Sequence, residues 1–184
     1  YPGGVVADDA GNLTSDIDGN PLTARYVVGR RSVSGSDVAL PNKALDEIAK
    51  ARTGEAIRSV APRSPEVGRD VGRAVFRRGG NPDYVAVSND LKAEQYARVA
   101  AHEIGHVIDK TVGEIPIGGL NDELRTIYND LNNPQSHGRR FGPEQNRYRG
   151  GDVPRELMAE AIRAYMVDPN YIKTVAPKTA ARIR

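Results

Sequence analysis

The chain contains no cysteine among its 184 residues, and this absence excludes disulfide bonds, thiol chemistry and zinc sites with cysteine ligands. Any metal ion must therefore be held by His, Asp, Glu or backbone oxygen atoms. A chain of this length can bury most of its apolar surface without disulfide bonds. We therefore expect a single domain, or one domain with an attached arm.

The chain also lacks a strong excess of one charge and any long apolar run. Its formal net charge of +2 is too small to indicate a nucleic-acid partner by itself. No apolar run approaches the ~20 residues needed to cross a bilayer, so we expect no membrane partner. No signal peptide is visible, and localisation stays open between a secreted or translocated effector and a cytoplasmic protein. Tyr1 is not an initiator Met, which predicts a piece of a longer chain.

The patterns along the chain predict an α+β fold. Residues 1–35 are rich in Gly, Asp, Asn and Ser and are predicted to form an N-terminal arm or hairpin that turns at residues 18–20. Residues 36–184 are predicted to form the main domain. We expect strands at 73–77 and 84–88, loops at 61–71 and 135–151, and helices at 41–54, from 89 or 90 to about 112, at 121–132, at 154–167 and in a short tail over 170–184.

Histidine is scarce, and the three that occur are His102, His106 and His137. The first two are four residues apart on a predicted helix, so both imidazoles can reach one metal ion at ~2.0–2.1 Å. Glu103 is rotated away from them, as expected of a base that takes a proton from the attacking water and passes it to the leaving amine. Gly105 leaves room for a crossing strand or loop. The segment predicts a zinc-dependent endopeptidase.

A catalytic zinc site needs a third protein ligand. His137 is one candidate, but it lies in a predicted loop without a partner at ligand spacing. Glu156 and Glu160 are four residues apart on one face of a half-apolar predicted helix. We assign Glu156 as the third ligand and Glu160 as the acceptor of the free ring N–H of a ligand His. Asp109 could serve the other His. The reverse assignment of the two glutamates, or a plain first-turn Glu at the helix dipole, stays open.

Peptide hydrolysis also needs a hydrogen-bond donor for the developing oxyanion. Tyr148, just upstream of Glu156, is the preferred candidate, and Tyr165 is the alternative. The second predicted strand immediately precedes the metal helix, and as an edge strand it could pair with an extended substrate. An ordinary core strand is the plain reading, and the two readings are compatible. Its substrate-binding residues would be Tyr84, Val85, Ala86 and Val87.

Two segments resemble a known family. His102 to Asp109, with the sequence His-Glu-Ile-Gly-His-Val-Ile-Asp, is similar to the active-site helix of the anthrax lethal factor and Pro-Pro endopeptidase family of zincins. Residues 156–163 resemble the downstream helix that supplies a Glu ligand in that family, and residues 176–179 resemble a turn near the lethal-factor C-terminus. The resemblance covers about residues 83–184.

This resemblance implies a zincin fold of the gluzincin type, with a small mixed sheet packed on the active-site helix and a mainly helical C-terminal half. It also implies one zinc ion, Glu103 as base and Glu156 as third ligand. The family carries a Tyr seven residues before the ligand Glu. Arg149 occupies that position here, and Tyr148 lies one residue further away.

The expected function is therefore cleavage of a protein or peptide, in an effector or toxin domain or in a processing module of a polyprotein. A second hypothesis is an inactive zincin-shaped binding module, against which the complete His, Glu, His and Glu set argues. A third is a basic nucleic-acid-associated domain of a mobile-element polyprotein. It rests on a basic run that we otherwise read as a solvated loop, formed by Arg139, Arg140, Arg147 and Arg149.

Overall fold

The computed structural model describes residues 5–7, 13–16, 40–133 and 140–184. In the N-terminal arm, β1 (Val5–Ala7) pairs antiparallel with β2 (Leu13–Asp16). The turn predicted at residues 18–20 and most of the arm lie outside the described residues. His137 and Arg139 lie outside them as well.

A three-stranded mixed sheet forms one side of the main domain. Its strands are β3 (Arg58–Val60), β4 (Gly72–Phe76) and β5 (Pro82–Ser88), in the order β3-β5-β4. β5 is parallel to β3 and antiparallel to β4. Residues 85–88 of β5 are buried.

The observed strand order shows that the prediction of an edge strand at residues 84–88 is wrong. The segment from Tyr84 to Val87 lies in β5, the central strand, where both neighbouring strands already pair with its backbone. β4 pairs with residues 82–87 and β3 pairs with residues 86–88, so β5 is not a free edge along which a substrate backbone could pair. The reason is β3, a strand of three residues within a region that carries no clear strand pattern. The edge on the other side is β4.

Two helices pack with the sheet around a first apolar core. They are α2 (Asn42–Thr53) and α3 (Ala93–Thr111). α2 ends at Gly54, whose φ of 93° is the left-handed conformation that glycine adopts most readily. α3 begins a few residues later than predicted and carries both motif histidines. The buried residues of this core include Leu45, Ala49, Val85, Val87, Ile104 and Val107.

The C-terminal half is helical and surrounds a second apolar core. It comprises α4 (Asn121–Asn132), the short 3-10 helix η1 (Pro143–Asn146), α5 (Asp152–Val167), α6 (Pro169–Val175) and α7 (Pro177–Ile183). The predicted helical tail is two helices, because Pro177 has no N–H to continue α6 and instead starts α7. Buried residues of this core include Leu124, Ile127, Leu157, Ile162 and Ile172.

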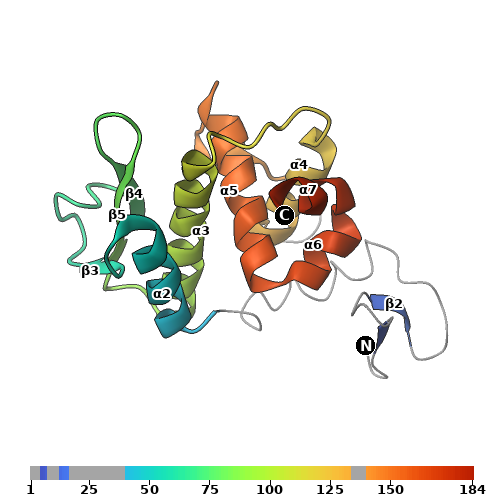
Figure 1. The fold of residues 1–184 in the computed structure, drawn as a ribbon, viewed down its shortest axis with the longest axis horizontal. Coiled ribbons are helices and arrows are strands. Elements are labelled where there is room, and N and C mark those ends of the chain that lie inside the picture. Colours follow the sequence, from blue (N-terminus) through green and yellow to red (C-terminus); the bar gives the residue numbers. More distant parts are fainter. Residues whose placement is uncertain (1–4, 8–12, 17–39, 134–139) are drawn as a thin grey trace.

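The two halves meet where α3 lies beside α5, in the middle of the molecule (Figure 1). Gly105 makes this close approach possible, because a Cβ atom there would lie 2.5 Å from the carbonyl oxygen of Ala159 in α5. The element that crosses Gly105 is therefore a helix, and the prediction of a strand or loop at this place is wrong. The fold is α+β and mostly helical, with one small mixed sheet in the main domain.

Within the described part of the chain, the helices are too short or too polar to cross a membrane.

Candidate metal centre

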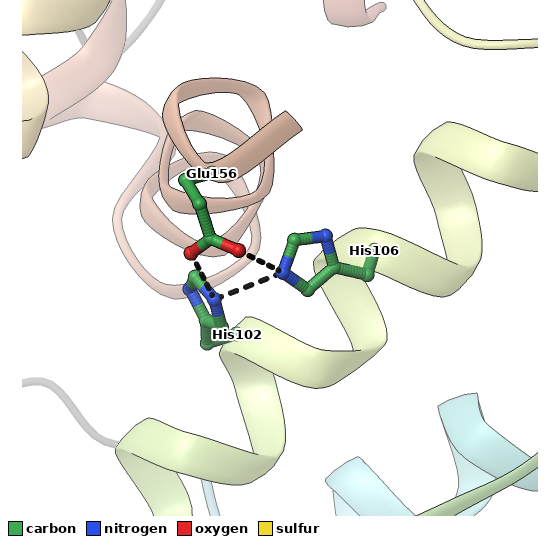
Figure 2. Close-up of side chains that lie close together, drawn as sticks. All are labelled: His102, His106 and Glu156. Carbon is green, nitrogen blue, oxygen red and sulfur yellow. Dashed lines mark hydrogen bonds and ion pairs between the residues drawn. The ribbon is translucent and has the colours of Figure 1, made fainter. Parts of the chain in front are cut away.

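Three side chains from the two central helices converge on one point (Figure 2). His102 and His106 come from α3 and Glu156 comes from α5. The two imidazole Nε2 atoms are 3.1 Å apart. The Glu156 carboxylate lies 3.2 Å from His102 Nε2 through Oε2 and 3.3 Å from His106 Nε2 through Oε1. The structure therefore brings together the three residues that were predicted as ligands.

These distances fit a metal ion. Ligands at ~2.0–2.1 Å from a tetrahedral centre are about 3.3 Å from one another. The three separations of 3.1, 3.2 and 3.3 Å are close to this value, with one oxygen of Glu156 facing each histidine. Two imidazole nitrogens and a carboxylate are also a donor set that divalent transition metals accept. The cluster can hold a metal ion with one position left for a further ligand.

Glu160 orients the first of these imidazoles. Its Oε1 lies 2.8 Å from Nδ1 of His102. An ionised carboxylate can only accept, so Nδ1 carries a proton, and a metal ion that displaced the proton of Nε2 would bind through the lone pair of that nitrogen. This is the contact predicted for Glu160, and it leaves Glu156 as the glutamate that faces both Nε2 atoms.

Arg163 holds Glu160 in turn and was not predicted. Its Nε and Nη2 atoms donate to Oε2 of Glu160 at 2.8 and 2.6 Å, and both residues are buried. A signal was present in the sequence: Arg163 follows Glu160 by three residues and Glu156 by seven, so all three share one face of α5.

The charges of the cluster support one another in the metal-free protein. Burial alone would lower the pKa of His102, but hydrogen bonds to Glu156 and Glu160 outweigh it and raise this pKa to about 10. Burial opposes ionisation of Glu156, yet the two imidazoles lower its pKa to about 2. Burial also opposes ionisation of Glu160, but the charges of Arg163 and His102 outweigh it and lower the pKa of Glu160 to about 2. At neutral pH both carboxylates are therefore ionised and His102 is protonated, so a metal ion that binds here would displace a proton from His102.

Glu103 lies beside the cluster and contributes no atom to it. Its Oε2 accepts a hydrogen bond from the backbone N–H of Ala74 in β4, at 2.8 Å. β4 comes this close because of Gly72, where a Cβ atom would overlap Val99 and lie 3.1 Å from Cγ of Glu103. Burial raises the pKa of Glu103. A carboxyl group with increased basicity thus stands next to the metal ligands, as predicted.

A cleft of about 810 Å³ exposes the cluster to solvent. β4 and the loop before it line one wall, and α3, α5 and the segment after α4 contribute the others. The predicted site residues on its surface are His102, Glu103, His106, Asp109, Tyr148, Glu156 and Glu160.

Asp109 lines the cleft but has a different partner from the one expected. Its Oδ1 accepts the backbone N–H of Ile115 at 2.7 Å, so its carboxylate holds the loop that follows α3. Burial raises its pKa. Spacing on the helix puts Asp109 near His102 on one side of α3. It could not predict a partner beyond the end of that helix.

Two phenols face the cleft. Tyr148 is half-buried, and burial together with the charges of Glu156 and Glu103 raises its pKa, so the phenol keeps its proton. Tyr128 was not predicted. Its hydroxyl accepts a hydrogen bond from Nδ2 of Asn146 at 2.8 Å, and burial with the nearby Glu160 charge raises its pKa to about 12. Tyr165, the alternative to Tyr148, packs against the second core.

Comparison with protein-family models gives no match, and comparison with curated proteins gives none either.

Proposed function

We propose that this chain is a zinc-dependent endopeptidase of the gluzincin type. The observation that carries the proposal is the convergence of His102, His106 and Glu156, with Glu103 beside them in an open cleft. Zinc is the metal that such a donor set most often binds in hydrolytic sites with a free position. When bound, it would polarise the peptide carbonyl and lower the pKa of a water molecule.

Glu103 is the proposed general base. Its Oε2 is held by the N–H of Ala74 at 2.8 Å, which orients the carboxylate while Oε1 exchanges a proton. Burial raises its pKa toward the working pH, and this makes it a better proton acceptor than an ordinary surface glutamate. It takes the proton of the attacking water and delivers it to the departing amine.

Tyr148 is the proposed donor to the developing oxyanion. Its raised pKa keeps the phenol neutral, so the hydroxyl can donate a hydrogen bond to an oxyanion in the cleft. The offset of one residue from the position seen in the resembling family is compatible with a donor carried on a loop.

An extended peptide is the proposed substrate. β4 is an edge strand whose residues line the cleft next to Glu103. Its backbone can therefore take the pairing role that the sequence had suggested for β5. The sequences of the peptides that the protein cuts would show which substrate side chains the cleft prefers.

The test is digestion of a mixed peptide library, followed by mass spectrometry, with the wild-type protein and the Glu103→Gln variant. Wild-type protein with zinc should cut a subset of peptides, and Glu103→Gln should cut none while keeping its zinc. An exposed acid remote from the cleft, Glu55, provides the matched control: Glu55→Gln should cut as wild type does. Equal cleavage by Glu103→Gln would remove Glu103 from the mechanism.

The same experiment addresses the inactive binding module. That hypothesis expects peptides to be retained but not cut. A separate salt-dependent titration with DNA addresses the nucleic-acid hypothesis. Arg149 already uses its guanidinium on the carbonyl groups of Glu144 and Tyr148, both at 2.9 Å, which argues for a structural role within its loop.

A further inference from the structure

The segment that carries Tyr148 is fastened to α4 by a paired arginine and glutamate. Arg125 of α4 donates from Nη2 to Glu144 Oε1 at 2.6 Å and from Nη1 to Oε2 at 3.1 Å. This two-point contact fixes both the position and the plane of the carboxylate. The carboxylate of Glu144 also packs closely against the backbone at Gly142, where a Cβ atom would lie 2.7 Å from Oε2.

Two further contacts fix the same segment to the same helix. The N–H of Phe141 donates to Oδ1 of Asn129 at 2.8 Å. Nδ2 of Asn146 donates to the hydroxyl of Tyr128 at 2.8 Å. The rings of Phe141 and Tyr128 are stacked, with centroids 6.5 Å apart. Phe141 precedes η1, and Glu144 and Asn146 belong to it, so their partners on α4 support η1.

η1 is in turn joined to Tyr148 through the backbone. The N–H of Tyr148 donates to the carbonyl of Pro143 at 3.2 Å. Arg147, directly before it, has a φ of 70°, a conformation that is uncommon for a residue with a side chain. Nothing but the surrounding contacts holds that conformation in place. A shift of η1 therefore moves the phenol over the cleft.

We propose that Arg125 is a positioning residue for peptide hydrolysis, which through its pair with Glu144 sets the location of the Tyr148 phenol. Neither Arg125 nor Glu144 lines the cleft, so neither touches the substrate. This inference rests on the proposed function. It adds a pair of residues, distant in sequence from every ligand, whose loss weakens the oxyanion contact and leaves the metal ligands as they are.

The chemistry decides which kinetic constant changes. A donor that acts on the developing oxyanion contributes chiefly in the transition state, and its removal lowers kcat by ~10²–10³-fold. Displacement of such a donor without its removal costs less, and about tenfold in kcat is the expected effect for Arg125→Gln. The KM should change by less than about twofold, since ground-state binding does not depend on this contact.

The test is a double-mutant cycle with Arg125→Gln, Tyr148→Phe and the combination of the two, on a peptide that the wild-type protein cuts. If Arg125 acts through the phenol, the combined variant is no slower than Tyr148→Phe alone. Exchanging the charges, with Arg125→Glu and Glu144→Arg together, should restore most of the lost kcat. This exchanged pair also decides the question if Arg125→Gln does not fold.

Arg58→Gln is the matched control, because it breaks an arginine–glutamate pair of the same length, 2.6 Å, on the sheet side of the molecule. Its kcat should equal that of wild type. Losses that multiply in the combined variant, or an Arg125→Gln protein with wild-type kcat, overturn the inference alone. A wild-type protein without Glu103-dependent cleavage overturns the proposed function and the role of Arg125 with it, and all variants are then equally inactive.

Discussion

At the scale of single residues, the metal centre is a chain of oriented groups. Arg163 holds Glu160, Glu160 holds Nδ1 of His102, and His102 presents Nε2 to the cluster. Each contact removes freedom from the next group, so the site is arranged before any metal ion enters. The carboxylate of Glu160 also increases the basicity of the His102 imidazole.

The Glu160→Gln variant should therefore bind zinc about 10–100-fold more weakly than wild type. The amide is a weaker acceptor for the Nδ1–H of His102, and it leaves the buried guanidinium of Arg163 without its counter-charge. Competition with a chromophoric chelator measures the affinity. Glu55→Gln, which breaks an exposed pair with Arg58, is the control and should bind as wild type. An unchanged affinity in Glu160→Gln would show that the orientation of His102 does not depend on this contact.

Local spacing predicted much of the site at this scale. The four-residue separations of His102 from His106 and of Glu156 from Glu160 each place two side chains on one helical face. Local spacing could not predict contacts between residues on different elements. Tyr128 and the bond from Asp109 to Ile115 depend on how the chain folds back after a helix ends, and spacing within a helix holds no information on that.

At the scale of elements, the site depends on the close contact between α3 and α5. Gly105 is the residue that permits it, since its Cα faces the backbone of Ala159 without a side chain between them. α3 supplies two of the candidate ligands and α5 supplies the third, so the separation of these helices sets the size of the candidate metal site.

Gly105→Ala should lower the free energy of unfolding by about 1–3 kcal/mol, because the added methyl group overlaps backbone atoms that cannot rotate away. The helices must move apart, and zinc affinity should fall as well. Urea unfolding, with and without zinc, measures both effects. Gly118→Ala is the control, because a Cβ atom there meets nothing within 4 Å. If Gly105→Ala is as stable as the control, the helices are not in the contact described.

Element types were more predictable than element partners. The helical periods and the strand patterns placed α2, α4, α5 and both longer strands within a few residues of their observed bounds. The sheet order was not predictable, because it depends on β3, whose residues Arg58 and Ser59 are exposed and show no apolar alternation. A central strand and an edge strand can have the same local pattern when their partners are distant in sequence.

At the scale of the whole molecule, the ligands join two separate apolar cores. One lies between the sheet, α2 and α3, and the other lies among the helices from α4 to α7. His102 and His106 belong to the first half and Glu156 to the second. A metal ion bound by these three residues would therefore link the two halves across their boundary.

Removal of the metal should lower the Tm of the whole domain. At a free zinc concentration of 100 times the Kd, binding contributes about 2.7 kcal/mol, or roughly 5–10 °C for a chain of this size. Differential scanning calorimetry with zinc and with a chelator measures the shift. Glu156→Gln, with its third ligand weakened, should show a much smaller difference. An equal Tm in both conditions for wild type would mean that the metal does not link the two cores.

The most direct test of the account is the zinc content of three purified proteins, measured by inductively coupled plasma mass spectrometry after dialysis against trace zinc. We expect about one zinc ion per chain in the wild type and in Glu103→Gln, and almost none in Glu156→Gln. This result would separate the ligand glutamate from the base glutamate. A wild-type protein without zinc, or a Glu156→Gln protein that retains it fully, would contradict the metal centre described.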